Sequence, residues 1–292
     1  KTLGTLFPVL KACAGGIDRV FFLAARTPGR ALALHAVARL QAQGARPLRV
    51  LELIARDKAC EHPDKACHGE SCPLARGFWD RVAPARAAAL ACDAMDGPAL
   101  RQVALAHQVC PYWLSHEMVR WSDVVVGDYN YWFDASALLH ALAVEREWRC
   151  AVLVDEAHNL VERGRDMYSA ALDERQLDAL RKSAPAPLRT PLQRLARSWR
   201  ELSEGVTQPF TVQESLSGRF VAGLQQASAA VADYLAEAPP VHGPLPALQQ
   251  FYFDLLAFLR LAETFGDHSQ FDLALHPRPR RPAVVATIRN LL

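Results

Sequence analysis

In the first part of the chain, short apolar runs are separated by stretches with helical spacing. The apolar runs of strand length cover 19–25, 48–54, 123–127 and 150–154. The stretches with apolar positions at helical spacing cover 30–43, 112–121 and 135–148. Strands that alternate with helices predict an α/β fold with a parallel, doubly wound sheet. We also expect the helix at 30–43 to end near Gly44.

The second part of the chain, after about residue 170, has a different pattern. The stretches with helical spacing are 173–182, 190–204, 211–236 and 247–264. This pattern predicts an all-helical insertion with a small core of its own. A short basic run at 278–281 follows, and the apolar run 283–288 is then expected to be a strand that returns to the parallel sheet.

Length and composition narrow the class of protein. A chain of 292 residues with 51% hydrophobic and 22% charged residues is globular, with either one core plus insertions or two domains. A formal net charge of +2 is too small for a broad electrostatic signal, so any nucleic-acid surface must be a local patch. The sequence has no apolar stretch of membrane-spanning length and does not begin like a signal peptide. We therefore expect a soluble, cytoplasmic protein without membrane contact.

Two adjacent acids follow the apolar run at 150–154. They are Asp155 and Glu156, with His158 just beyond. In open α/β sheets the ligand crevice lies beyond the carboxyl ends of the strands, so these side chains are expected there. Such an aspartate can hold a Mg²⁺ ion that bridges nucleotide phosphates, and the glutamate can orient or deprotonate an attacking water. The alternative is that the acids only solvate a loop or cap the next helix.

A group of cysteines interrupts the α/β pattern. Its members are Cys60, Cys67, Cys72 and Cys110, with the spacing Cys-x6-Cys-x4-Cys-x37-Cys. The stretch 58–73 has little apolar periodicity, so a metal centre would supply the missing crosslink. Four thiolates satisfy a [4Fe-4S] cluster. A zinc site, with His62 or His68 in place of one cysteine, and unliganded thiols are the competing interpretations. The odd total of seven cysteines argues against a disulfide framework.

Polar side chains also follow two other expected strands. Arg26 and Thr27 could hold the phosphates of a nucleic-acid strand, and Tyr129 and Asn130 are candidates for contact with DNA. An ordinary solvated turn explains the first pair equally well, and a capped helix beside buried tyrosines would explain the second. Aromatic rings near the cysteines lie beside cations, as in a track for single strands, although most such rings belong to a core. These rings are Phe78, Trp79, Tyr112 and Trp113.

The order of these features resembles the iron-sulfur DNA helicases of the XPD/DinG type. The residues that carry the resemblance are Lys-Thr at 1–2, Arg-Thr at 26–27, Cys-Pro-Tyr at 110–112, Val-Val-Val-Gly-Asp-Tyr-Asn-Tyr at 124–131 and Asp-Glu-Ala-His-Asn at 155–159. The last of these has the form of a DEAH-type Walker B motif. The resemblance is specific and spans about residues 1 to 170. It implies a P-loop NTPase (RecA-like) sheet and an ATP-driven motor that moves 5′ to 3′ on single-stranded DNA.

The resemblance also implies roles for residues of the expected motor. Lys1 and Thr2 would contact phosphate and Mg²⁺ as the end of a Walker A motif. Asp155 would hold Mg²⁺, Glu156 would activate water, and His158 would couple hydrolysis to motion. ATP would be the substrate, and single-stranded DNA and its junctions with duplex would be the partners.

For the cysteine region, the resemblance implies a 4Fe-4S cluster that acts as a wedge between strands. Its ligands would be Cys60, Cys67, Cys72 and Cys110. Cys13, Cys92 and Cys150 would then be ordinary thiols. Arg56 matches a basic residue that the family places just before its first ligand, and Arg26 and Thr27 match its DNA contacts.

The implied domain plan has five parts. These are motor domain 1 at 1–56 and 113–170, an iron-sulfur domain at 57–112, a helical arch at 171–277, and a strand at 278–292 that returns to motor domain 1. The glycines of Walker A and a second motor domain are missing from these 292 residues. We therefore expect the chain by itself neither to hydrolyse ATP at a useful rate nor to unwind DNA. The alternative function is a non-enzymatic zinc module that docks nucleic acid or protein.

Overall fold

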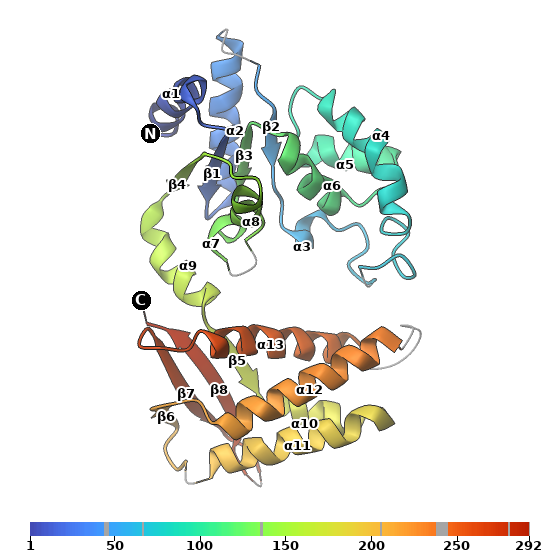
Figure 1. Cartoon of the computed structure of the whole chain (residues 1–292), viewed down its shortest axis with the longest axis vertical. Helices are drawn as coiled ribbons and strands as arrows, with labels where there is room; N and C mark the ends of the chain where they lie inside the picture. The colour runs from blue at the N-terminus through green and yellow to red at the C-terminus, as the bar shows by residue number, and fades with distance from the viewer. Residues whose placement is uncertain are drawn as a thin grey trace. The chain divides into compact units, whose positions relative to one another are not determined.

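The computed structural model forms two compact units, unit 1 at Lys1–Leu160 and unit 2 at Val161–Leu292 (Figure 1). None of the helices in the described part of the chain combines the length and apolar character needed to cross a bilayer. The expected helix end near Gly44 and Arg280 of the basic run lie outside the described residues. The structure describes 1–43, 47–65, 67–134, 137–204, 206–237, 245–279 and 281–291.

Unit 1 contains a four-stranded parallel sheet. Its strands are β1 (Arg19–Ala24), β2 (Val50–Glu52), β3 (Val124–Gly127) and β4 (Cys150–Asp155), in the order β2-β3-β1-β4. Each strand falls inside one of the apolar runs, and β1 and β3 are almost completely buried. The predicted parallel sheet is therefore confirmed, because buried parallel strands read as continuous hydrophobic sequence.

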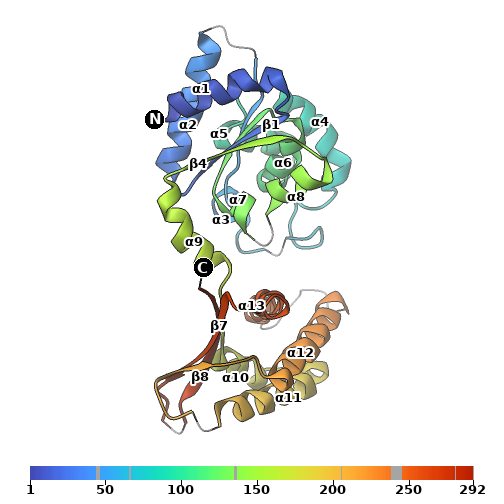
Figure 2. The same cartoon turned by 60° about the vertical axis from the view of Figure 1, so that its left-hand side comes forward.

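Helices cover both faces of this sheet (Figure 2). On one face, α1 (Thr2–Ala12) and α2 (Thr27–Ala42) form a core with side chains such as Phe22. On the other face, the ring of Phe21 lies 5.3 Å from that of Trp132 in α7 (Asn130–Phe133). Neighbouring residues of β1 thus point to opposite faces, as the pleat of a strand requires. The remaining elements here are η1 (Cys13–Gly15), α8 (Leu138–Glu145) and η3 (Ala157–Asn159).

The cysteine region is an insertion between β2 and β3. It contains α3 (Arg56–Ala59), α4 (Phe78–Leu90), α5 (Gly97–Ala106), α6 (Pro111–Met118) and η2 (Val119–Trp121). Between α3 and α4 the described chain has turns but no helix or strand. Glu61 in this stretch accepts two hydrogen bonds from Arg101 of α5, at 2.5 and 2.8 Å. This charge-assisted pair ties the irregular segment to a helix.

Unit 2 combines a four-stranded antiparallel sheet with helices. Its strands are β5 (Ala170–Asp173), β6 (Phe210–Gln213), β7 (Ser269–His276) and β8 (Ala283–Asn290), in the order β5-β8-β7-β6. Its longer helices are α10 (Glu174–Lys182), α11 (Ala186–Ser203), α12 (Gly218–Glu237) and α13 (Leu245–Glu263), and α9 (Leu160–Met167) precedes β5. The core gathers large side chains including Trp199, Phe220 and Phe258.

Two expectations for this part of the chain are wrong. The segment 171–277 is not all-helical, because it contributes β6, β7 and most of β5. The strand at 283–288 exists as part of β8, but it pairs with β5 and β7 and does not return to the parallel sheet. The physical reason is local, since His276 pairs with Ala283 across a short connection and antiparallel strands need little chain to meet.

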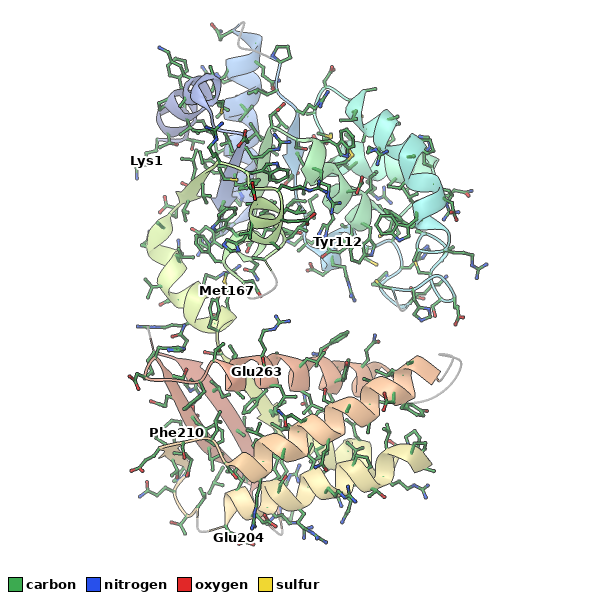
Figure 3. The ribbon with its side chains drawn as sticks, in the orientation of Figure 1. Lys1, Tyr112, Met167, Glu204, Phe210 and Glu263 are labelled. Atoms are coloured by element: carbon green, nitrogen blue, oxygen red, sulfur yellow. The ribbon has the colours of Figure 1, made fainter. Side chains whose placement is uncertain are left out.

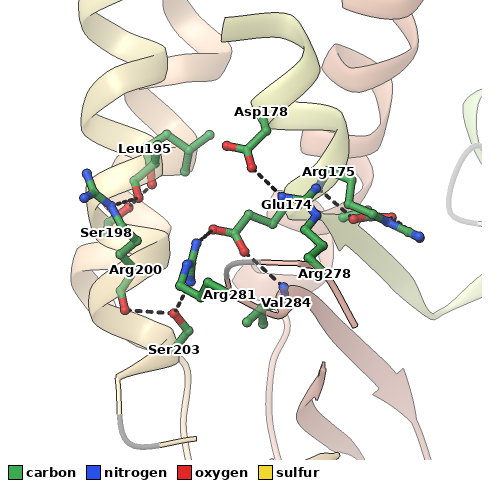
Figure 4. A network of polar contacts seen from close by, with 12 residues as sticks. Glu174, Arg175, Asp178, Leu195, Ser198, Arg200, Ser203, Arg278, Arg281 and Val284 are labelled. Carbon is green, nitrogen blue, oxygen red and sulfur yellow. Dashed lines mark hydrogen bonds and ion pairs between the residues drawn. The ribbon is translucent and has the colours of Figure 1, made fainter. Parts of the chain in front are cut away.

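A buried carboxylate joins α10 to β8 in unit 2 (Figure 4). Glu174 is 2% exposed and accepts hydrogen bonds from the Arg281 guanidinium and from the backbone N–H of Val284, the latter at 3.0 Å. Nearby, Arg278 donates to Asp178 at 2.7 Å. Arg278 and Arg281, the described cations of the basic run, thus form ion pairs with acids of α10. Their presence in the sequence does not by itself indicate an anion site.

Candidate functional site

The carboxyl ends of β1, β3 and β4 meet at one edge of the parallel sheet. Leu23 pairs with Gly127, and Ala24 pairs with Asp155. The residues that follow these strands therefore emerge side by side. They include the predicted site residues Arg26, Thr27, Tyr129, Asn130, Asp155 and Glu156.

Asp155 is half-buried at the end of β4, against the first turn of α2. A Cβ atom built on Gly29 would lie 3.0 Å from the Asp155 Oδ2 atom, so the helix backbone passes very close to the carboxylate. The amino-terminal end of a helix favours negative charge, because its first N–H groups have no partner within the helix. The Asp155 carboxylate therefore lies against the amino-terminal turn of α2.

Glu156 has an unusual backbone conformation. Its φ and ψ are 50° and 48°, in the left-handed region, which costs a residue other than glycine about 1 kcal/mol. Its side chain is exposed, and its Oε2 atom lies 3.4 Å from Nδ1 of His158, an ion pair only when that histidine is protonated. Mg²⁺ prefers one or two carboxylates together with substrate phosphates, so Asp155 and Glu156 fit a magnesium site.

The turn at Glu156 is held by hydrogen bonds to its backbone carbonyl. Asn159 donates to this oxygen from its backbone N–H at 2.9 Å and from its side-chain amide at 3.1 Å. The Tyr129 hydroxyl donates to the same oxygen at 3.1 Å and also contacts the carbonyl oxygen of Asp155. The sequence analysis assigned no role to Asn159, although its place directly after the Asp-Glu-Ala-His residues was a signal.

The predicted contact of Tyr129 with DNA is not supported by its position. The side chain is completely buried, so its ring does not reach a surface on which a base could stack. Asn130, the next residue, is exposed at the sheet edge. The physical reason is the tight turn after β3, in which successive side chains point in different directions.

The other predicted DNA contacts are exposed. Arg26 precedes the first turn of α2, and Thr27 accepts a hydrogen bond from the buried Arg30 at 3.1 Å. Arg30 also lies 3.8 Å from Glu52 of β2. Arg56 begins α3, ahead of the first cysteine of the group. Arg26 and Arg56 therefore present their charges to solvent, while the Thr27 hydroxyl is partly used within the fold.

Lys1 lies at the exposed start of α1 (Figure 3). The helix begins at Thr2, and it packs against α2 and β4. Among the described residues, the side chains of Lys1 and Thr2 form no hydrogen bond or ion pair with Asp155 or Glu156. Their assignment to nucleotide phosphate therefore stays a prediction.

The four cysteines of the predicted cluster line one small cavity. Trp113 lies at the same cavity. Cys72 is buried, Cys60 and Cys110 are half-buried, and Cys67 is exposed. Within the described part of the chain, no three histidine, cysteine or acidic side chains converge tightly enough to hold a single metal ion.

The surroundings of Cys110 fit a site for several thiolates. Burial raises the pKa of this thiol, and the nearby charges of Cys60 and Cys67 raise it further, while backbone N–H groups of Trp113 and Tyr112 lower it. Thiolates that repel one another in this way need a cation between them to stay charged together. The donor set therefore fits a group bound by four thiolates, although the structure does not identify that group.

The remaining thiols lie apart from the cavity. Each donates a weak hydrogen bond to a nearby backbone carbonyl, at 3.4 Å for Cys13, 3.6 Å for Cys92 and 3.5 Å for Cys150.

Of the aromatic rings near the cysteines, Phe78 is buried and Trp79 is 75% exposed. The other two, Tyr112 and Trp113, are partly exposed.

Part of the chain is similar to known proteins. Residues 46–177 match the DEAD_2 family profile. The chain is 30% identical over 139 residues to the "Regulator of telomere elongation helicase 1 homolog" of Anopheles gambiae, which covers 43% of this chain and 14% of that protein. It is 30% identical over 84 residues to the "General transcription and DNA repair factor IIH helicase subunit XPD" of Dictyostelium discoideum, covering 29% of this chain and 11% of that protein. The matches thus span a small part of each relative.

Solved structures show the same fold. One described as "XPD_Helicase" has a TM-score of 0.54 and 16% sequence identity, and the match covers 99% of this chain and 49% of that chain. One described as "Truncated XPD" has a TM-score of 0.53 and 17% identity, and the match covers 90% of this chain and 74% of that chain. At these identities the likeness concerns the fold alone.

Proposed function

We propose that this chain is a fragment of an XPD-type helicase and that it carries the ATP-hydrolysing acids of a DNA motor; the DEAD_2 match and the similarity to helicase sequences support this. The motor is proposed to move 5′ to 3′ along single-stranded DNA and to open duplexes at their junctions with single strands. The cysteine group is proposed to hold a 4Fe-4S cluster at the point of strand separation.

The observation that supports this proposal most is the common edge of the parallel sheet. Asp155 and Glu156 emerge there beside the exposed Arg26 and Asn130, because β1, β3 and β4 are in register. A hydrolytic site and a nucleic-acid contact on neighbouring strand ends give a short path between ATP turnover and movement on DNA. Crevices at the carboxyl ends of strands are where α/β proteins bind their ligands.

In the proposed reaction, the two acids have separate tasks. When bound, Mg²⁺ would offset the charge that develops during transfer of the γ-phosphoryl group. Asp155, half-buried at the end of β4 and next to the first turn of α2, would hold the ion. Glu156, with an exposed carboxylate, would orient the attacking water and take its proton. His158, whose Nδ1 atom lies 3.4 Å from the Glu156 Oε2 atom, would couple hydrolysis to motion through that carboxylate.

The proposed DNA contacts follow from charge and exposure. Arg26 and Arg56 would bind phosphates, since guanidinium groups form paired hydrogen bonds with phosphate oxygens. Trp79, which is 75% exposed in the cysteine region, and Trp113, at the cysteine cavity, would offer rings on which bases stack. A cluster held by Cys60, Cys67, Cys72 and Cys110 would make this region rigid enough to divide two strands.

The test of the hydrolytic role compares Glu156 with Glu147, which has a similar positive φ. The gene product that contains this sequence is purified, and its ATP turnover is measured with and without single-stranded DNA. Glu156→Gln should lower the DNA-stimulated turnover about 100-fold or more, because it removes a general base. Glu147 is also exposed and also has a positive φ, of 52°. It precedes the amino end of β4, whereas Glu156 follows the carboxyl end of the same strand.

Glu147→Gln should therefore leave the turnover unchanged. Equal activities of the wild type and Glu156→Gln would refute the proposed role of the acids. In the same assay, the 292-residue chain by itself should show no useful turnover. Unwinding of matched duplexes with either a 5′ or a 3′ overhang tests the direction, and only the 5′ overhang should support strand separation.

A further inference from the structure

The hydroxyl of Tyr129 connects two strands that are not neighbours in the sheet. Tyr129 follows β3, while the carbonyl groups that it contacts follow β4, and β1 lies between these two strands. The ring is completely buried, so it can adopt few other positions. The turn that carries the two acids is therefore attached to the end of β3 by a rigid side chain.

The same turn is the strained part of the site. Glu156 stays in the left-handed region, with φ of 50° and ψ of 48°, although it has a bulky side chain. Its carbonyl oxygen receives donors from Tyr129 at 3.1 Å and from Asn159 at 2.9 and 3.1 Å. A strained conformation persists only where the surroundings fix it, and the buried phenol is one of the groups that do so.

We propose that Tyr129 is a positioning residue for Glu156, a role that rests on the proposed hydrolysis of ATP at this site. The hydroxyl fixes the peptide groups on both sides of Glu156, and these groups set the direction in which its carboxylate projects. Without the hydroxyl, the turn relaxes toward a more common backbone conformation and the carboxylate leaves its place beside the water. Nucleotide binding should be spared, because the completely buried Tyr129 ring exposes no surface to a nucleotide.

Tyr131 provides a matched control two residues away. Its hydroxyl donates to the backbone carbonyl of Ile54, after β2, at 3.1 Å. Substitution of either tyrosine by phenylalanine removes one hydroxyl group, which contacts the backbone carbonyl groups of Asp155 and Glu156 in Tyr129 and that of Ile54 in Tyr131. Both variants are therefore expected to lose a similar amount of thermal stability, while only Tyr129 is bonded to the turn of the acids.

The experiment measures kcat and KM for ATP in the gene product, with saturating single-stranded DNA. Tyr129→Phe should lower kcat about ten- to hundred-fold with an unchanged KM, because misplacement of a catalytic group by about 1 Å has effects of this size. Tyr131→Phe should retain the wild-type kcat. A kcat of Tyr129→Phe equal to that of the wild type, or an equal loss in both variants, would overturn the proposal.

Hydrogen exchange in the 292-residue chain separates this proposal from the proposed function. The amide of Asn159, which donates to the Glu156 carbonyl, should exchange faster in Tyr129→Phe and at the wild-type rate in Tyr131→Phe. If the wild-type gene product hydrolyses no ATP, the proposed function fails, and unchanged exchange in Tyr129→Phe overturns the positioning role independently. If Tyr129→Phe does not fold, Asn159→Ala removes another donor to the same carbonyl, and an unchanged kcat in that variant counts against the proposal.

Discussion

Burial of His116 should make unit 1 lose stability as the pH falls. This residue lies on α6, and its ring packs against those of Tyr112, Trp113 and Tyr131, with centroids 4.2, 5.5 and 5.9 Å away. Its Nε2 atom is buried and has no hydrogen-bond partner among the described residues. Burial lowers the pKa of His116 from 6.5 to about 4, because the aromatic surroundings disfavour the charged imidazolium.

The sign of the effect follows from proton binding. In the unfolded chain the His116 pKa returns to its ordinary value, so between about pH 4 and 6.5 the unfolded state binds more protons than the folded state. Acidification through this range therefore favours unfolding. Between about pH 7.5 and about pH 5, the free energy of unfolding should fall by about 2 kcal/mol from this residue alone. This is an upper figure, since part of the ring is exposed.

The substitution His116→Phe isolates this contribution. Phenylalanine keeps the aromatic packing but does not titrate, so the variant should lose less stability than the wild type over the same pH range. Urea denaturation followed by tryptophan fluorescence reports mainly on unit 1, because Trp199 is the one tryptophan that lies in unit 2. The fitted free energies at the two pH values are compared for each protein.

His35→Phe is the control for this measurement. His35 lies exposed on α2 in the same unit, so its replacement should leave the pH profile of the wild type unchanged. Parallel profiles for the wild type and His116→Phe would show that burial of His116 does not couple folding to pH. An equal effect of His35→Phe would lead to the same conclusion.

Three further substitutions test other parts of the structure. Glu174→Ala leaves the buried backbone N–H of Val284 without its acceptor and should lower the free energy of unfolding of unit 2 by about 2 kcal/mol, measured by urea denaturation and circular dichroism. Cys72→Ser should remove bound iron and the absorption band near roughly 400 nm, whereas Cys92→Ser should retain both; zinc in place of iron in the purified protein would contradict the cluster. Gly29→Ala should reduce DNA-stimulated ATP turnover, since the new Cβ would lie 3.0 Å from the Asp155 carboxylate. Unchanged turnover would show that this close approach is unimportant.

The parallel sheet could be predicted because its signals are local. The strands β1, β3 and β4 are apolar except for Arg19 at the start of β1 and Asp155 at the end of β4, and polar residues follow each run. Such strands need no knowledge of their partners to be recognised. The position of Asp155 and Glu156 at a strand end followed from the same reasoning, and the structure agrees.

The sheet of unit 2 could not be predicted in the same way. β5 and β6 have four residues each, and their pattern is too short to distinguish from the ends of helices. In β7, Phe271, Leu273 and Leu275 alternate with other residues, so a strand signal was present. The flanking sequence favours helix, and pairing with β8 decided that this segment is a strand.

The sequence by itself predicted the four strands of the parallel sheet, the acidic turn after β4 and the group of four cysteines. Each of these depends on residues that are close together in the chain. Tertiary structure alone decided that Cys60 and Cys110 line one cavity and that Tyr129 is buried, with its hydroxyl on the backbone carbonyl groups of Asp155 and Glu156. The physical reason is that burial and hydrogen-bond partners depend on segments far apart in sequence, whose meeting is fixed by the packing of the whole unit.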